Sequence, residues 1–592
     1  MTLPAGSEST AGPFLRSLAR TLARHYPGDV EPTADLHRAL AFLESDLRAD
    51  TVVRAGYVLA LPVAGIALCA LLVGLPWLPV AATVPASLGV GLGATHAVHR
   101  LPVVAAALRR TRALGDAPGL VARAALRLRL EATPERAATF AARTGTGPLA
   151  RSLGAHADRT RSGPADGFAA FAAEWEPWFP ALDRATSLLS AAADAPPDER
   201  TAALDRALDT VLDGTRAEMA DFAGAVRGPA SGIYAFGVLL PLALVGVLPA
   251  ARAGGVSIPT AAFVALYDVA LPIGLAGAGA WLLLQRPIAL PPPPVTAAHP
   301  AVPSGAHRGV AGGIVGVAIG LVGGPLVAPW AAPVAAVGFG VGAALAAHYQ
   351  PRAAVQRDVR ETESGLADAT AVVGRRVGAG ESVERALGAA GEATTGRTSD
   401  LFRTAAGVQR RLRVGIHEAF LGDYGALAAV PSPRAHATAT LLAVAAEEGR
   451  PAGATLVTLA DHLTELRRVE AEARRELSAI TGTLAHTAAL FGPLVGGATV
   501  AMATRMAASG ATAQASASLA GSTTLGAATL GPSTLGTAVG GYVLALAGVL
   551  TATATGLDRG LDRTLVGYRI GLALVSATGA YLAAVFGAST LF

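Results

Sequence analysis

The sequence predicts an all-α, polytopic helical membrane protein, and three observations support this fold class. Of its 592 residues, 52% are hydrophobic and only 15% are charged, whereas a soluble domain averages about 25% charged residues. Apolar runs long enough to cross a hydrocarbon core of about 30 Å recur along the chain. The polar stretches between these runs carry apolar residues at helical spacing.

The chain divides into a short N-terminal region and nine expected spans. Residues 1–54 should form cytoplasmic helices, because Leu15, Leu18 and Leu22 recur at helical spacing beside arginines. Such a helix could rest on anionic lipid or pack on the protein's own domains. The expected spans are Ala55–Leu75, Leu78–Val98, Gly232–Ala250, Thr260–Leu284, Gly309–Val327, Pro329–Ala347, Leu484–Met506, Leu535–Thr555 and Val566–Leu591.

Four polar or low-complexity segments separate these spans. Two large polar regions, residues 99–231 and 349–483, should be helical domains. Residues 285–308 are rich in proline and should form an extended linker without helix. Residues 507–534 are rich in Ala, Ser, Thr and Gly, carry no charge, and should form an exposed loop.

The positions of arginine near span ends predict the orientation. Most of them fall on one side if both polar regions are cytoplasmic: Arg100, Arg286, Arg308, Arg352, Arg559, Arg563 and Arg569. The other side then holds Arg252, with Arg505 at its boundary. We therefore expect a cytoplasmic-membrane protein whose N-terminus and both polar domains are cytoplasmic and whose C-terminus is outside.

The two halves of the chain are similar in sequence. Leu72-Val73-Gly74 recurs 249 positions later as Leu321-Val322-Gly323, and Glu135-Arg136-Ala137 recurs at the same offset as Glu384-Arg385-Ala386. Farther along the offset becomes 252, so that Pro241 matches Pro493. Each copy would contain two spans, one cytoplasmic domain and two more spans. Because four spans is an even number, the copies should be parallel repeats, with one span left over at the C-terminus.

Few residues suggest chemistry. All 47 basic residues are arginine, which excludes a lysine-dependent phosphate loop and a lysine Schiff base. The single cysteine, Cys69, excludes a disulfide framework and a cysteine-based zinc site. We expect no catalytic, metal or cofactor site, and the scattered arginines do not indicate nucleic acid.

Two features within the expected spans have structural explanations. The glycine runs Gly89–Gly93 and Gly338–Gly342 fit close helix packing better than a nucleotide loop, since no strand precedes them. Asp268 is the one acid well inside a span. Because a charge there is costly, we expect a hydrogen bond to another helix ahead of a role in ion coupling.

In the second polar domain, Glu448-Gly449 precede a helix with Leu456, Leu459 and Leu463, and an arginine-rich helix then leads into a span with Pro493. This pattern resembles the type II secretion system F domain. The first domain is a weaker copy, because a proline-containing segment replaces the Glu-Gly turn. With two such domains and an extended N-terminal segment, the chain looks most like archaeal members, which serve type IV pilus-like and archaellum machines.

The resemblance implies a non-enzymatic platform in the membrane. Such platforms are thought to couple a cytoplasmic hexameric secretion ATPase to the extraction and polymerisation of pilin-like subunits, and a homodimer is left open. In this sequence the ATPase contact would fall on the second domain. Its expected residues are Glu447, Glu448, Arg467, Arg468, Glu470, Arg474 and Arg475.

Two alternatives compete with the platform. A transporter or permease built from parallel repeats would need a polar site near the membrane midplane, and the sequence has almost no charge there. The arginine-rich helix could also be a purely structural face held by internal Glu–Arg pairs, each contributing about 0.2–0.5 kcal/mol.

Overall fold

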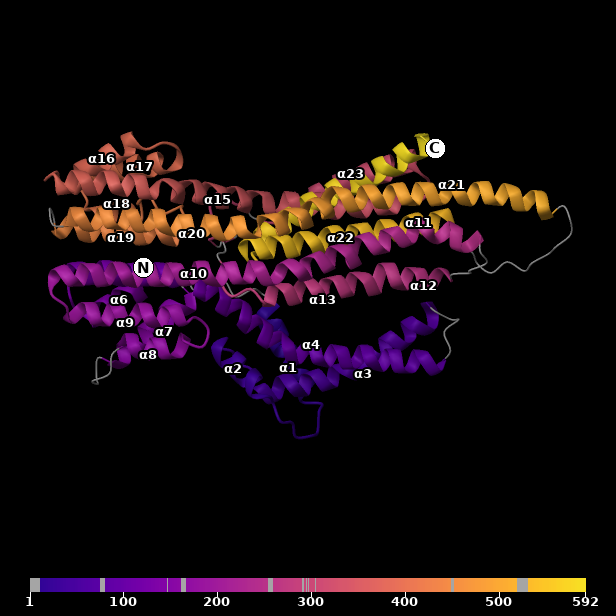
Figure 1. The fold of residues 1–592 in the computed structure, drawn as a ribbon, viewed down its shortest axis with the longest axis horizontal. Helices are drawn as coiled ribbons and strands as arrows, with labels where there is room; N and C mark the ends of the chain where they lie inside the picture. Colours follow the sequence, from indigo (N-terminus) through magenta and orange to yellow (C-terminus); the bar gives the residue numbers. More distant parts are fainter. Residues whose placement is uncertain are drawn as a thin grey trace.

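A computed structural model describes residues 11–591, except for 75–79, 146, 161–166, 254–258, 290–291, 294, 297, 304, 449–451 and 519–530. Regular secondary structure in these residues is entirely helical, which confirms the all-α part of the prediction. Figure 1 shows an elongated bundle in which the longest helices run along the long axis.

The N-terminal half contains thirteen α-helices among the described residues and two π-helical segments. Their bounds are α1 Ala11–Ala23, α2 Ala34–Phe42, α3 Ala49–Gly74, α4 Val80–Gly115, α5 Ala117–Leu130, α6 Pro134–Thr144, α7 Gly147–Thr160, α8 Gly167–Trp175, α9 Pro180–Asp194, α10 Pro197–Tyr234, η1 Ala235–Leu239, α11 Leu240–Ala253, α12 Thr260–Val264, η2 Ala265–Ala270 and α13 Leu271–Leu284.

The C-terminal half follows after the linker. Its bounds are α14 His307–Val327, α15 Ala332–Gly378, α16 Val383–Ala393, α17 Gly396–Leu412, α18 Ile416–Leu421, α19 Pro433–Glu448, α20 Ala452–His486, η3 Thr487–Phe491, α21 Gly492–Ser518, α22 Pro532–Arg559 and α23 Arg563–Leu591.

Eight helices of the described chain are long and apolar enough to cross a membrane, one fewer than the nine expected. The missing span is Leu78–Val98, whose described part lies in α4. Its apolar stretch is diluted by glycines, Thr95, His96 and His99. Even so, α4 packs along α3 (Figure 1), so the two helices form a hairpin although α4 is only weakly apolar.

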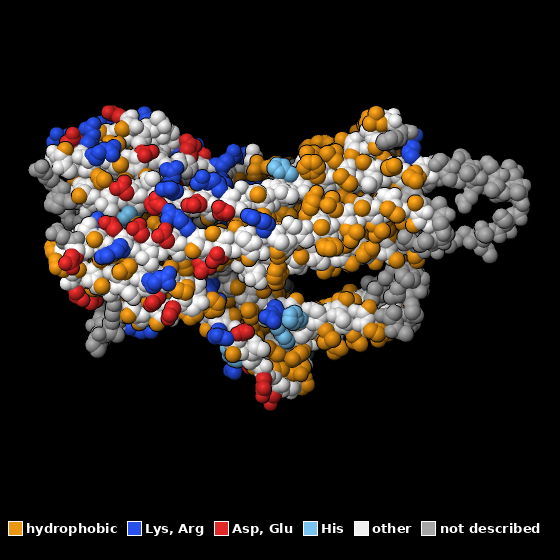
Figure 2. Space-filling view, in the orientation of Figure 1, with side chains coloured by type: hydrophobic (Ala, Val, Ile, Leu, Met, Phe, Trp, Pro, Cys, Tyr) orange, Lys and Arg blue, Asp and Glu red, His pale blue; other side chains and the backbone are white. Residues whose placement is uncertain are grey.

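Charged and apolar surfaces occupy opposite ends of the molecule. Figure 2 shows Asp, Glu and Arg gathered over the end that contains α16–α20, and hydrophobic side chains over the end that contains α11, α21 and α22. Three long helices, α10, α15 and α20, extend from the charged end toward the apolar end. The expected domain boundaries at residues 231, 349 and 483 therefore lie within α10, α15 and α20, so each helix continues across the boundary.

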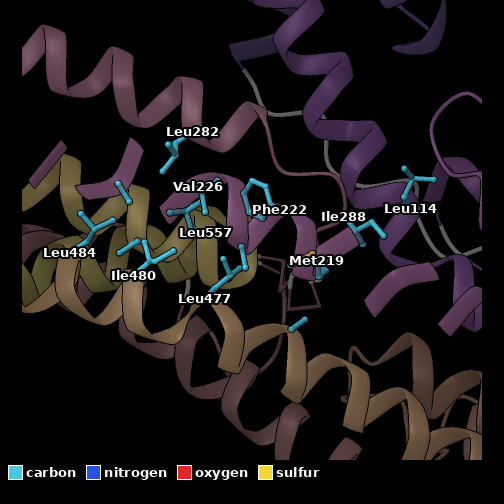
Figure 3. Packing of buried hydrophobic residues seen from close by; sticks show 14 of the residues in the cluster. Leu114, Met219, Phe222, Val226, Leu282, Ile288, Leu477, Ile480, Leu484 and Leu557 are labelled. Atoms are coloured by element: carbon cyan, nitrogen blue, oxygen red, sulfur yellow. The ribbon is translucent and has the colours of Figure 1, made fainter. Parts of the chain in front are cut away.

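Helix α22 forms the centre of the apolar end. It packs against α13, α20, α21 and α23, and Tyr542, Leu546 and Leu550 are fully buried. Figure 3 shows how the core continues toward the charged end, where Phe222 and Val226 of α10 approach Leu557 and meet Leu477 and Ile480 of α20. One hydrophobic core thus joins the apolar end of the molecule to α10 and α20.

Glycines allow α14 and α15 to pack closely. A Cβ on Gly320 would overlap the backbone of Ala335. On the other face of α15, a Cβ on Gly338 would overlap Thr578 of α23. The packing explanation of the second glycine run is therefore confirmed at Gly338, since the Thr578 side chain occupies the space that a Cβ would need. In the first run, a Cβ on Gly91 would lie 2.6 Å from the carbonyl oxygen of Ala60 on α3, which confirms close packing there, whereas Gly89 and Gly93 have open space around them.

Each π-helical segment ends two residues before a proline. The segments η1, η2 and η3 precede Pro241, Pro272 and Pro493. Proline clashes with the carbonyl four residues earlier and cannot donate to it, and a wider turn relieves that conflict. Two of the freed carbonyls accept side-chain hydroxyls, Gly237 O from Tyr542 and Ala489 O from Ser576 at 3.1 Å.

Helix starts recur between the two halves at the sequence offsets. Helices α6, α7 and α8 begin at residues 134, 147 and 167, and α16, α17 and α18 begin 249 positions later, at 383, 396 and 416. The π segments η1 and η3 begin at 235 and 487, an offset of 252. Gly147 and Gly396, which open α7 and α17, both have positive φ angles, of 85° and 65°.

The proline-rich linker 285–308 and the expected loop 507–534 differ in secondary structure. Helix α21 continues to Ser518, so the first part of the expected loop 507–534 is helical. This correction follows from its alanine content, because alanine is the strongest helix former. Residues 519–530 lie outside the described part. The linker is free of helix in its described residues before His307, as expected, and Val302 packs on Val355 and Val359 of α15.

The N-terminal helix α1 packs on α3. Of the two sequence interpretations, contact with the protein's own helices is thus observed.

Candidate partner surface and membrane-interface cleft

Helix α20 carries the expected partner residues and connects three regions of the structure. Its first turns bury Leu456 and Leu459 in the core of the second polar domain. Farther along, Val469, Ala473 and Leu477 are buried in the main core. The helix then continues through η3 into α21. Apolar residues at helical spacing thus hold α20 against both cores, and its charged residues occupy the remaining faces.

Four of the expected contact residues are exposed. Glu447 lies at the end of α19, and Arg467, Arg468 and Arg475 lie along α20. The side chain of Arg468 is 72% exposed and its nearest acid, Glu465, is 4.0 Å away, so it is largely free for a partner. Arg467 donates to the carbonyl of Ser364 on α15. Glu448 ends α19, and its side chain and the following Gly449 lie outside the described residues.

Glu470, in contrast, lies inside the structure. Its side chain is 11% exposed and forms an ion pair with Arg434 of α19. Arg434 also lies 3.8 Å from Glu363 of α15, which accepts a hydrogen bond from Ser432 at 2.6 Å. These contacts brace α15, α19 and α20 against one another. Glu470 is thus an internal brace between α19 and α20; its ion pair joins two helices and is not one of the Glu–Arg pairs within a single helix that the structural alternative expected.

The two polar domains meet along α10 and α20. Arg216 of α10 forms an ion pair with Glu465 and lies 3.5 Å from Glu472, both on α20. Arg129 of α5 pairs with Asp205 of α10, and its Nη1 donates to Thr458 of α20 at 3.4 Å. These charged contacts, together with the burial of Leu126 of α5 in the core of the second domain, join the domains into one body.

A small cavity of about 90 Å³ lies at this junction, between α5, α19 and α20. Asp116, Arg123, Arg434 and His462 line it. Burial raises the pKa of the Asp116 carboxyl to about 6, although Arg123 and Arg434 oppose the shift. Burial also lowers the pKa of Arg123 to about 10, opposed by Asp116.

A larger cleft of about 630 Å³ opens beside α20 at the border between the charged and apolar ends. Its walls come from α20, η3, α22 and α23. Three arginines line it, Arg474, Arg475 and Arg569, together with one acid, Asp558. Along the other direction the lining is small or apolar, with Ala485, Ala489, Leu572, Ala573 and Ser576. The cleft is therefore cationic at one end and apolar at the other.

The acid in this cleft is already engaged. Asp558 lies 3.2 Å from Arg559 and 3.3 Å from Arg569. Arg474 and Arg475 form no ion pair with any residue that the structure describes, and the Nε of Arg474 and one terminal nitrogen of Arg559 are buried without a hydrogen-bond partner. The charge of Arg360, on α15, is also repelled by Arg474, Arg559 and Arg569. The region carries an excess of positive charge.

A buried arginine, Arg286, attaches the proline-rich linker to the end of α22. Arg286 is 4% exposed and donates to the carbonyls of Ile288 at 2.8 Å and Gly556 at 2.5 Å. Burial lowers its pKa to about 10, partly offset by Asp558. This residue, which was expected only as a topology signal, fixes the start of the linker to the end of α22.

Asp268 does not form the expected hydrogen bond with any described residue. It lies in η2, half-buried, with its carboxylate against Gly541 of α22, where a Cβ would be 2.6 Å from Oδ1. Its neighbour Tyr267 makes the interhelical bond instead, donating to the carbonyl of Pro241 at 2.6 Å. The interhelical contact of this segment is therefore made one residue away from the position expected.

Sequence reasoning missed the interdomain pairs and the cleft. Arg216 of α10 matches Arg468 at the repeat offset of 252, but that match does not indicate an ion pair with α20. Likewise, nothing in the linear pattern brings Arg569 to Arg474. Among the described residues there is no group of three or more His, Cys, Asp or Glu that could hold a metal ion.

Comparisons with protein-family models, with characterised proteins and with solved structures found no match.

Proposed function

We propose that this chain is an integral membrane platform for assembly of a type IV pilus-like filament or a related secretion system. It would couple a cytoplasmic hexameric ATPase to the extraction and polymerisation of pilin-like subunits, and it would not itself be an enzyme. The proposal starts from the resemblance of the second polar domain to the type II secretion system F domain. The structure adds physical features that such a role requires.

The observation that carries the proposal is the continuity of the long helices. A platform must transmit a movement from a cytoplasmic motor to the membrane bundle. A long helix that is closely packed against its neighbours can transmit such a movement, because close-packed protein interiors are rigid. Helix α20 runs from the second domain into the membrane bundle through η3 and α21. Helices α10 and α15 link the same two ends.

Two finer features belong to the proposal. The matching helix starts and π segments favour a tandem parallel repeat, in which α10 and α20 are equivalent helices that pack on each other. The arginine distribution favours cytoplasmic placement of the N-terminus and both polar domains. An ATPase on that side could then reach both domains at once.

Within this proposal, the ATPase surface consists of the exposed members of the expected set: Glu447, Arg467, Arg468 and Arg475. Arg474 is half-buried in the cleft and Glu470 is internal, so these two would act through position and not by contact. The first domain, which lacks the Glu-Gly turn, would be chiefly scaffold.

The test is to reverse the charges of Arg467 and Arg468 together, as Arg467→Glu and Arg468→Glu, in the full-length chain, and to leave Arg475 unchanged because it also lines the cleft. We expect membrane insertion to persist, and both copurification of the secretion ATPase and filament formation to fall at least tenfold. The matched control reverses two exposed arginines elsewhere on the same domain, Arg385→Glu and Arg411→Glu, and should leave both readouts unchanged.

If the α20 variant keeps wild-type copurification and filaments, the charged face is structural and this ATPase surface is wrong. If no ATPase copurifies with the wild-type chain and purified protein in vesicles instead moves a solute, the transporter alternative replaces the platform.

A further inference from the structure

We propose that the cleft between α20, α22 and α23 binds one anionic phospholipid, with its phosphate at Arg474, Arg475 and Arg569 and an acyl chain along Ala485, Ala489 and Leu572. This inference depends on membrane insertion but not on the proposed ATPase coupling.

The location of the cleft suits a phospholipid. Helix α22 ends at Arg559 and α23 begins at Arg563, so the cleft opens where two membrane helices meet the polar end of the molecule. Phospholipid phosphates lie at that depth, and their acyl chains extend from it into the apolar region. The order of the lining, cationic and then apolar, matches the order of groups in a phospholipid.

The charge of the cleft favours an anionic headgroup. Basic pockets between membrane helices on the cytoplasmic side are typical binding sites for anionic lipid headgroups. Here the lining has three arginines against Asp558, which two arginines already contact. The Nε of Arg474 is buried without an acceptor. Buried cationic donors without partners are unfavourable, so a ligand with several anionic oxygens would satisfy what the protein leaves open.

The size of the cleft also suits a lipid. A cleft of about 630 Å³ is in the range of small-ligand sites, about 300–1,000 Å³. A spanning helix about 10 Å wide and 30 Å long would occupy roughly 2,400 Å³, nearly four times as much. The cleft therefore fits a lipid headgroup with part of a chain better than a transmembrane helix of another protein.

The first half of the chain provides an internal comparison. At an offset of 252, the positions of Arg474 and Arg475 correspond to Phe222 and Ala223. Both residues are buried in the core, at 5% and 1% exposure. The equivalent place in the first half is thus filled by the protein itself, and the arginine-lined opening is a specific feature of the second half.

The experiment uses the full-length protein, purified in a neutral detergent and titrated with phosphatidylglycerol or phosphatidylcholine, with bound lipid counted by native mass spectrometry. The wild-type chain should bind phosphatidylglycerol at least tenfold more tightly. The variant Arg474→Gln, Arg475→Gln, Arg569→Gln should lose about 100-fold in that affinity, on the basis of about fivefold for each basic residue at the membrane surface.

The matched control replaces three other exposed arginines near span ends, Arg100, Arg227 and Arg308, by glutamine. It removes the same charge, lies outside the cleft, and should keep wild-type binding. The variant Ala485→Leu, which narrows the apolar end, should weaken lipid binding while a monodisperse elution profile confirms folding.

Three results would overturn the proposal. Equal binding of both lipids would show that the site does not recognise the anionic headgroup. Displacement of the lipid by inorganic phosphate, with no effect of Ala485→Leu, would show a site for a soluble anion. Cross-linking from position 485 in cells to a protein, with no lipid captured, would show that a membrane helix is the occupant.

Discussion

Replacing Glu470 by glutamine tests whether this residue is an internal brace or a partner contact. The change keeps the shape of the side chain and removes its charge, so Arg434 loses its closest acid. Breaking a buried ion pair costs about 3–5 kcal/mol. Arg434 is 31% exposed and keeps Glu363 at 3.8 Å, so solvent and the second acid should reduce the loss to about 2 kcal/mol.

The assay is amide hydrogen exchange on the full-length protein in detergent, read on peptides from α19 and from the first half of α20. A loss of about 2 kcal/mol corresponds to about 30-fold faster exchange wherever opening of these helices limits the rate. The control Glu476→Gln changes an exposed acid on the same helix and should leave exchange unchanged. Wild-type exchange in Glu470→Gln, combined with loss of ATPase copurification, would refute the brace and restore Glu470 as a contact residue.

Two further predictions concern the domain junction and the α14–α15 hairpin. Because burial raises the pKa of Asp116 to about 6, the folded state holds this proton more tightly than the unfolded state, whose pKa is near 3.8; stability from this group is present below pH 4 and is lost as the pH rises through 6. Asp116→Asn should abolish that decline in a thermal-unfolding series from pH 4 to 7.5, and an unchanged pH profile would contradict the assignment. Gly320→Ala should destabilise the protein by about 1–3 kcal/mol in thermal unfolding, because its Cβ overlaps the Ala335 backbone, whereas Gly323→Ala, with open space around it, should not. Equal effects of the two alanines would refute close packing at Gly320.

The parts of the fold that depend on local pattern were predictable from the sequence. Apolar runs predicted eight spans that the structure also has, and the resemblance of the two halves anticipated helix starts that recur at the same offsets. Each π segment precedes a proline, but Pro62 inside α3 and Pro325 inside α14 have no π segment, so a proline in an apolar helix did not by itself predict one. In α4 the mean hydropathy is too low to mark a span, although the helix packs on α3 as a hairpin. Packing on a neighbour can hold a helix that is only weakly apolar, and hydropathy alone does not reveal it.

The candidate sites were less predictable, because they depend on which helices become neighbours. Glu470 and Glu476 are both acids on α20 and look alike in the sequence. In the structure, Glu470 pairs with Arg434, whereas Glu476 is exposed to solvent. The cleft brings Arg569 to Arg474 from segments almost a hundred residues apart. A single sequence states the charge of each residue but not the element that covers it.

The most direct test of the whole account is the side of the membrane on which each region lies, because both proposals require the polar domains to be cytoplasmic. Single cysteines would be introduced in a Cys69→Ser background at exposed positions Arg20, Arg159, Arg411, Met506 and Thr590, and intact cells would be treated with a membrane-impermeant thiol reagent. The account predicts labelling at positions 506 and 590 and protection at 20, 159 and 411. Labelling at 20 alone among the last three would show that α4 does not cross the membrane, and labelling at 159 or 411 would contradict the central claim.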